Sequence, residues 1–211
     1  MNIGMCIKRA LLITGTTLAL SMPALAATID VGGVKIEDTS KVGNTQLKLN
    51  GAGIRKKLFV NVYVGALYLS EKKSTLAEIM ALPGPKRIQL TMMRDVTSDT
   101  MGQSFMDGLN HNSTKVEKTK IVNQMQKFGE MFAAIPELKK GDVVSVDWVP
   151  NVGSLTTLNG KPTAEPFPDV AFFNALLRIW IGEQPAYAPL KNQMLGLSEK
   201  AAAPESSRKE N

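Results

Sequence analysis

The segment that decides the fold runs from Gly51 to Leu69 and reads GAGIRKKLFVNVYVGALYL. Its second part, from Leu58 onward, is rich in Val, Tyr and Phe and is apolar at nearly every position. That composition predicts a β-strand with both faces covered. Its first part places Gly51 and Gly53 just before Arg55. Glycines permit a tight approach of backbone at this point, and an arginine there can point inward.

Two positions of the Arg55 side chain are compatible with this spacing. Arg55 is either an exposed arginine on a β-turn or an inward side chain in apolar surroundings. An inward guanidinium is costly unless it meets an anion, which would be a carboxylate or phenolate ligand or an internal acid. Tyr63 lies eight residues further on, so the two side chains share a face if the strand is unbroken. Tyr68 lies five residues after Tyr63 and is therefore expected on the opposite face.

Period-two patterns predict more strands on either side of this segment. The pair Gly32 and Gly33 marks a turn between two short strands, and the pair Asn159 and Gly160 marks another. The predicted strands are the hairpin Thr28–Glu37, then Thr45–Leu49, Ile88–Val96, Val143–Val149 and Ser154–Leu158.

Helical spacing of apolar residues predicts four helices. They are residues Thr97 to about His111, Thr114 to Ala134 before Pro136, Pro168 to Ile181, and a short one from Pro189 to Leu195. Grouped strands followed by grouped helices predict an α+β fold with an antiparallel sheet, not a wound parallel sheet.

The N-terminal segment, from Met1 to Ala26, has the pattern of an export signal. Lys8 and Arg9 are followed by the apolar stretch Ala10–Met22 and by the cleavage pattern Ala24-Leu25-Ala26. We expect a mature protein that begins at Ala27, lies in a bacterial periplasm and has no stable membrane insertion after the signal is cleaved. Cys6, the single cysteine, leaves with the signal.

The domain organisation that follows is simple. Residues 1–26 are the signal peptide, residues 27–197 form one folded domain, and residues 198–211 form a polar tail that we expect to be disordered. Hydrophobic residues make up 44% of the 211-residue chain and charged residues 21%. Ordinary globular proteins have a similar composition.

The composition argues against several kinds of chemistry. One histidine and one cysteine cannot supply a zinc or iron site, and His111 has no nucleophile motif near it. We therefore expect no metal and no cofactor. The formal charge of +6 is mild and no aromatic residues interleave the basic clusters, so nucleic-acid binding is not expected.

Two stretches carry a family resemblance. Gly51–Arg55 together with Phe59–Leu69, and later Phe172–Gly182, resemble the chalcone isomerase-like family. The resemblance implies an open-faced β-sandwich, in which a large antiparallel sheet is covered by a helical layer with a ligand cleft between them. Plant enzymes of that family cyclise chalcones without a cofactor, whereas non-catalytic relatives bind fatty acids or act as auxiliary proteins.

The resemblance also implies a role for Arg55. It matches the arginine that holds the substrate's anionic oxygen in the enzymes and the carboxylate in the fatty-acid binders. Tyr63 stands where the enzymes carry a threonine, as in the lipid-binding branch. Thr97 and Ser104 stand where the enzymes carry a tyrosine and an asparagine, and Ile179 replaces a hydroxyl residue. A lone arginine binds an anion but aligns an intramolecular closure poorly.

Three hypotheses follow. The first is a periplasmic binding protein for a small amphipathic anion, a fatty acid before a phenolic compound, with Arg55 pairing to the anion and Tyr63 donating a hydrogen bond. The second is a cofactor-free intramolecular lyase or isomerase of the chalcone isomerase type. The third is an interaction or envelope-maintenance protein with a filled core and no cleft, in which an internal acid such as Asp95 pairs with Arg55. The ligand-binding residues expected under the first are Arg55, Tyr63, Thr97, Ser104, Phe59, Met92, Phe105 and Phe173.

Overall fold

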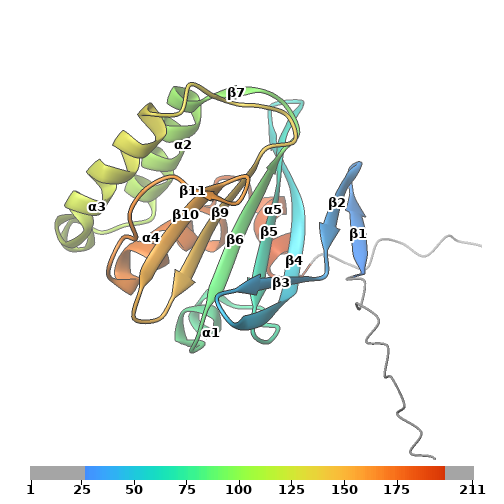
Figure 1. Ribbon diagram of the computed structural model, residues 1–211, viewed down its shortest axis with the longest axis horizontal. Helices are drawn as coiled ribbons and strands as arrows, with labels where there is room; N and C mark the ends of the chain where they lie inside the picture. The colour runs from blue at the N-terminus through green and yellow to red at the C-terminus, as the bar shows by residue number, and fades with distance from the viewer. Residues whose placement is uncertain (1–26, 198–211) are drawn as a thin grey trace, which may run out of the picture.

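Seven antiparallel strands form the main sheet of the computed structural model, which describes residues 27–197. The expected signal peptide and C-terminal tail lie outside the described residues. The strands are β3 (Thr39–Val42), β4 (Thr45–Lys57), β5 (Val60–Leu69), β6 (Lys86–Met92), β9 (Val143–Val149), β10 (Gly153–Leu158) and β11 (Lys161–Pro162). Their order across the sheet is β11-β10-β9-β6-β5-β4-β3 (Figure 1).

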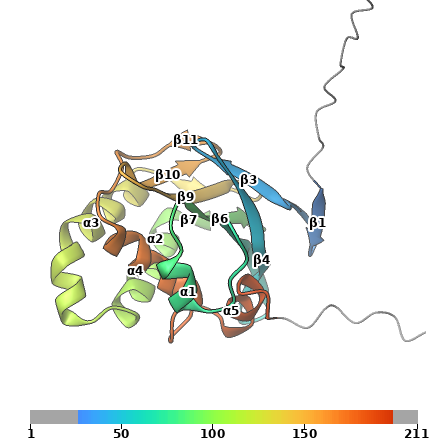
Figure 2. The same ribbon diagram turned by 90° about the horizontal axis from the view of Figure 1, so that it is seen from below.

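Helices cover one face of this sheet, as Figure 2 shows. They are α1 (Leu76–Ala81), α2 (Ser98–His111), α3 (Lys115–Ala133), α4 (Val170–Ile181) and α5 (Ala188–Met194). Two small ribbons complete the described chain: the hairpin of β1 (Thr28–Val31) with β2 (Val34–Glu37), and the pair β7 (Val96–Thr97) and β8 (Glu137–Leu138). The predicted α+β class with a helix-covered antiparallel sheet is confirmed.

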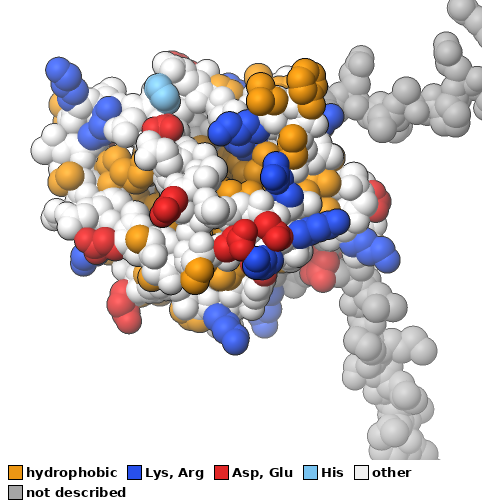
Figure 3. All heavy atoms as spheres, turned by 90° about the horizontal axis from the view of Figure 1, so that it is seen from above, with side chains coloured by type: hydrophobic (Ala, Val, Ile, Leu, Met, Phe, Trp, Pro, Cys, Tyr) orange, Lys and Arg blue, Asp and Glu red, His pale blue; other side chains and the backbone are white. Residues whose placement is uncertain are grey.

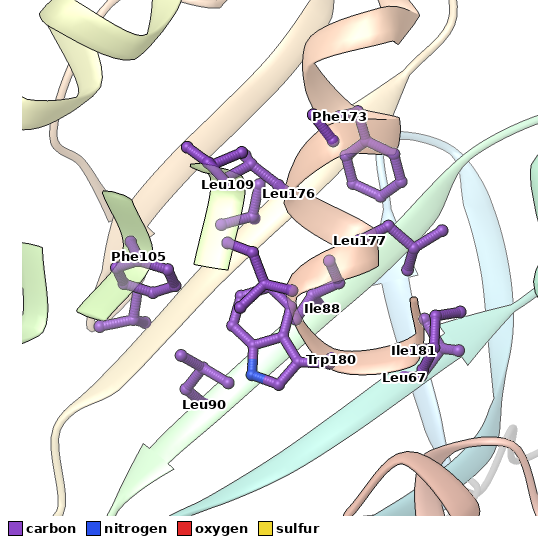
Figure 4. Packing of buried hydrophobic residues seen from close by; sticks show 14 of the residues in the cluster. Leu67, Ile88, Leu90, Phe105, Leu109, Phe173, Leu176, Leu177, Trp180 and Ile181 are labelled. Atoms are coloured by element: carbon purple, nitrogen blue, oxygen red, sulfur yellow. The ribbon is translucent and has the colours of Figure 1, made fainter. Parts of the chain in front are cut away.

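The larger of the two hydrophobic cores among residues 27–197 lies between the sheet and the helices and is organised around α4, and a smaller one includes Ile36 of β2 and Tyr68 of β5. Eight of the twelve residues of α4 are buried, because the helix is packed against the sheet on one side and against α2 and α3 on others. Figure 4 shows Leu176 and Trp180 of α4 beside Phe105 and Leu109 of α2. The ring centres of Phe105 and Trp180 are 5.5 Å apart in an edge-on arrangement. Aromatic pairs favour this geometry, and the packing ties the helical layer together.

Local sequence signals account for most element boundaries. Thr97 caps α2 by accepting a hydrogen bond from the Thr100 amide, and Thr114 caps α3 in a reciprocal capping box with Glu117. Asn159 and Gly160 both have positive φ, as the predicted turn requires. The hairpin predicted for residues 28–37 is also present.

Three regions differ from the prediction. The strand expected from Leu58 begins instead at Val60, because Leu58 and Phe59 form a two-residue loop between the paired residues Lys57 and Val60. The strand expected over residues 88–96 ends at Met92. The helix α1 and the strands β3 and β8 were not predicted, although Thr75 and Glu78 form a capping box at the start of α1.

Helix α5 packs directly on the backbone of the sheet. Gly51 and Gly53 lie on the face of β4 that meets α5, and Gly65 lies opposite Gly53 on β5. A Cβ added at Gly51 would overlap the main-chain oxygen of Gln193, and one added at Gly65 would contact Leu190. The glycine pair read from the sequence therefore marks a close approach of a helix.

Replacing Gly51 with alanine should destabilise the protein by about 2–3 kcal/mol, because the added methyl group forces the backbone of α5 away from β4. Gly129→Ala is the matched control: this glycine lies in α3, and a Cβ there meets nothing within 4 Å. The control should gain up to about 1 kcal/mol from helix propensity. Urea unfolding of both variants measures the difference, and equal midpoints would contradict the close-packing argument.

Candidate functional site

A cavity of about 420 Å³ opens where the end of the β4–β5 hairpin meets the start of α2. Figure 3 views the molecule from this end and shows Lys and Arg side chains beside a hydrophobic surface. Most of the lining is apolar, and four charged residues contribute to it. The lining residues are Arg55, Lys57, Leu58, Val60, Val62, Tyr63, Arg94, Asp95, Val96, Thr97, Thr100, Met101, Ser104, Phe105, Ile179 and Ala186.

Arg55 and Tyr63 face each other across two strands. Arg55 on β4 lies directly opposite Tyr63 on β5, and its guanidinium carbon lies 5.7 Å from the centre of the Tyr63 ring. This separation is within the range of a cation–π contact. The prediction that they share a face is confirmed, but its reason was wrong. They belong to two paired strands, not to one unbroken strand.

A β-bulge beside this pair adds a second apolar side chain to the cavity wall. Arg55 pairs with Tyr63, whereas the next residue, Lys56, pairs with Asn61, so that Val62 is an extra residue on β5. Bulges re-aim side chains in this way. As a result Val62 and Tyr63, although neighbours in sequence, both line the cavity.

The Arg55 side chain makes no ion pair or hydrogen bond to another residue within 27–197. Asp95, the internal acid proposed for it, instead accepts a hydrogen bond of 2.7 Å from the Lys140 amide and lies 3.8 Å from the Lys139 ammonium. The hypothesis of a filled core with an Arg55–Asp95 pair is therefore wrong for this structure. Arg94 also lines the cavity and contributes a second guanidinium to its lining.

Tyr63 is held by the last turn of α4. Its hydroxyl oxygen accepts a hydrogen bond of 2.9 Å from the indole nitrogen of Trp180, and both residues are buried. Burial raises the pKa of Tyr63 to about 12, although the nearby charge of Arg55 and the hydrogen bond from Trp180 act in the opposite direction. Tyr63 is thus a neutral phenol, and its hydroxyl donates no hydrogen bond to another residue within 27–197.

Thr97, Ser104 and Phe105 all line the cavity from α2 and its N-cap. The two hydroxyl groups, however, are engaged within the same helix. Thr97 Oγ1 donates to Thr100 Oγ1 at 2.8 Å, and Ser104 Oγ donates to the Thr100 carbonyl at 2.8 Å. Phe105 contributes an apolar surface, and Met101, one turn before it, was missed although it lies at helical spacing on the same side.

Phe59, Met92 and Phe173 are not in the cavity lining, which corrects their predicted positions. Phe59 is fully exposed at the hairpin loop. Met92 lies opposite Tyr63 but is enclosed in the core, and Phe173 lies two turns before Trp180 on α4, where it packs against Trp148. These errors arise because an apolar side chain has the same pattern in a core as in a cavity wall.

A second, more polar hollow of about 360 Å³ adjoins the first. The two share Arg55, Lys57, Ser104 and Ala186, so that Arg55 lies between an apolar space and a polar one. The exposed His111 borders the polar hollow.

Two general features of the described residues bear on the site. Within residues 27–197, no three His, Cys, Asp or Glu side chains are grouped so as to hold a metal ion. Over the same range, none of the helices has the length and apolar character needed to cross a membrane.

Comparison with known proteins agrees with the fold. A solved structure of a fatty-acid binding protein from Arabidopsis thaliana superimposes with a TM-score of 0.65 over 80% of this chain and 96% of that one, at 14% sequence identity. The likeness shows the predicted sheet-and-helix architecture. No curated protein sequence matches the chain. The sequence profile of the chalcone isomerase-like family matches residues 27–196, which is most of the chain, and the protein therefore belongs to the chalcone isomerase-like family.

Proposed function

We propose that the protein binds a small amphipathic anion, a fatty acid in the first place. The observation that carries this proposal is Arg55, a partly buried guanidinium without an acidic partner among residues 27–197, at the side of a mostly apolar cavity. A cation in such a position has lost part of its hydration, so an anionic ligand is its natural partner.

The two ends of such a ligand match two parts of the site. A carboxylate beside Arg55 accepts its N–H groups and the Tyr63 proton, and such charge-assisted bonds are stronger than neutral ones. The tail then lies against the apolar part of the lining, including Val62, Met101 and Phe105. The cavity volume of about 420 Å³ suits one small ligand. Ligand pockets ordinarily measure from about 300 to about 1,000 Å³.

The comparisons support a fatty acid over other anions. The similar Arabidopsis thaliana structure is named as a fatty-acid binding protein. A phenolate would also pair with Arg55, so phenolic compounds are the second ligand class to test.

Cyclisation of a chalcone-like substrate is the alternative activity, and the site geometry gives it less support than binding. That reaction depends on groups that align the attacking oxygen with the enone. The hydroxyl protons of Thr97 and Ser104 are already donated within α2 and its N-cap. Arg55 and Tyr63 suffice to hold an anion, but they fix only one end of a substrate in place.

We also propose that binding takes place after export to the periplasm. The proposal rests on the signal pattern of residues 1–26 and on the family match, which begins at residue 27 where cleavage is expected.

Arg55→Ala should weaken the binding of a medium-chain or long-chain fatty acid about 10- to 100-fold, the loss expected for a hydrogen-bonded charge. The affinity of Arg55→Lys should lie between those of the wild type and Arg55→Ala, since lysine keeps the charge and loses the planar guanidinium. Titration calorimetry on delipidated protein measures the affinities, with a phenolic chalcone as second ligand. Lys161→Ala, on the exposed strand β11, is the control and should bind as the wild type does. Unchanged affinity in a folded Arg55→Ala variant would disprove the proposal.

Tyr63→Phe should change the alkaline stability profile in a defined direction. Between about pH 10 and pH 12 the unfolded chain has lost this tyrosine proton while the folded chain keeps it, so the free energy of unfolding falls as pH rises. The variant lacks this contribution of about 2–3 kcal/mol and should fall less steeply. At neutral pH it should be less stable, because the Trp180 N–H loses its acceptor. Urea unfolding across this range is the measurement, and parallel profiles would refute the pKa assignment.

Protein recovered from the periplasm of an expressing bacterium should begin at Ala27 and contain no cysteine. Intact-mass spectrometry determines the cleavage point directly. Replacing Ala24 and Ala26 with bulky residues should leave the precursor uncut, because the signal peptidase requires small residues there. A full-length chain in the cytoplasm would contradict the export proposal.

A further inference from the structure

The loop of the β4–β5 hairpin presents hydrophobic side chains to solvent. Leu58 is 88% exposed, Phe59 is 100% exposed and Val60 is 43% exposed. We call residues 56–60 the hairpin tip. Single exposed apolar residues are common on protein surfaces, but three consecutive ones at a protruding loop form a patch that requires an explanation.

The conformation of the tip also departs from what a hairpin loop prefers. Leu58 has a φ of 55°. A positive φ is found at the first central position of a type II′ turn, where glycine is the usual residue. An L-residue with a bulky side chain is strained there. The loop thus has a leucine at a position where glycine would adopt the same backbone conformation with less strain.

The charge on the hairpin is of one sign, and the one acidic residue beside it in the cavity lining, Asp95, is bonded to the Lys140 amide and lies near Lys139. Lys56 and Lys57, both exposed, come directly before Leu58. No aspartate or glutamate occurs from Gly51 to Ser70, so the hairpin itself carries only positive charge. Apolar side chains flanked by lysines are complementary to an anionic lipid surface, which offers hydrocarbon below a layer of negative headgroups.

The tip is part of the rim of the ligand cavity. Lys57, Leu58 and Val60 line that cavity together with Arg55. A protein that rests on a bilayer through the hairpin tip therefore brings the cavity mouth to the headgroup layer, where the carboxylate of a membrane-bound fatty acid lies.

We propose that the hairpin tip inserts into the surface of an anionic phospholipid bilayer, with Leu58 and Phe59 in the apolar layer and Lys56 and Lys57 against the headgroups. The tip thereby docks the protein for exchange of ligand between membrane and cavity. The docking itself is independent of the proposed function, whereas the exchange rests on it.

Sedimentation with lipid vesicles, in the absence of added fatty acid, tests the docking. The purified protein should bind phosphatidylglycerol vesicles, bind phosphatidylcholine vesicles weakly, and lose binding as salt is raised. Phe59→Ser should weaken binding about tenfold, through loss of the buried ring. Lys56→Glu should weaken it about fivefold or more, since each basic residue near such a surface contributes about 1 kcal/mol.

Val116→Ser and Lys120→Glu are the matched controls, because both residues are exposed on α3 and neither lines the cavity. They should bind vesicles as the wild type does. The wild type and all variants are purified as the same mature chain beginning at Ala27, so the N-terminal signal cannot cause a difference between them. Tip variants that bind like the wild type, or equal binding to neutral and anionic vesicles, would overturn the proposal.

Two further readouts separate the ways in which the proposal can fail. In Phe59→Trp, emission should shift to the blue and be quenched by brominated lipid chains, and an unchanged spectrum would exclude insertion. Arg55→Ala should lose fatty-acid affinity and keep vesicle binding, whereas Phe59→Ser should do the reverse. A wild-type dimer that Phe59→Ser dissociates, with no vesicle binding, would assign the tip to a contact between copies of the chain and refute membrane docking.

Discussion

The packing of α5 on bare backbone is the constraint on which the site depends. Gly51 and Gly53 of β4 and Gly65 of β5 leave room for Leu190, Gln193 and Met194 to lie directly on the sheet. Arg55 is the next residue on the same face of β4, and it emerges beyond the start of α5, beside Ala186. Alternate residues of β4 face the same side of the sheet, so the strand that places Gly51 and Gly53 under α5 places Arg55 just beyond the part of the sheet that α5 covers.

The cavity wall and the core are one structure. Trp180 belongs to the aromatic cluster that joins α4 to α2, and it also fixes the Tyr63 hydroxyl. Phe105 contacts both the cluster and the cavity. A packed wall of this kind would preorganise the groups that the proposed anion meets, so less conformational freedom would be lost on binding. It also means that changes inside the cavity alter the stability of the fold.

Sequence reasoning succeeded where the cause of structure is local. The helix starts expected at Thr97 and Thr114 and the Asn159-Gly160 turn depend on residues within or next to the elements they define. It failed at Leu58 and Phe59, since an apolar loop without glycine or asparagine resembles the strand that follows it. Whether Phe173, Met92 or Phe105 faces a cavity depends on which helix covers it, and no pattern within one segment contains that information. The inward position of Arg55 came from the family resemblance; spacing alone left it open.

The hydrogen bond between Trp180 and Tyr63 gives the protein an optical property. The indole N–H is bonded to the one tyrosine among residues 27–197 that lines the cavity. Any anion that draws the Tyr63 proton toward itself makes the phenol oxygen a better acceptor and so alters the polarity that Trp180 experiences. The other tryptophan, Trp148, packs near Phe173, outside the cavity lining. If the proposed anion binds in the cavity, the fluorescence of Trp180 should therefore change with occupancy, whereas that of Trp148 should not.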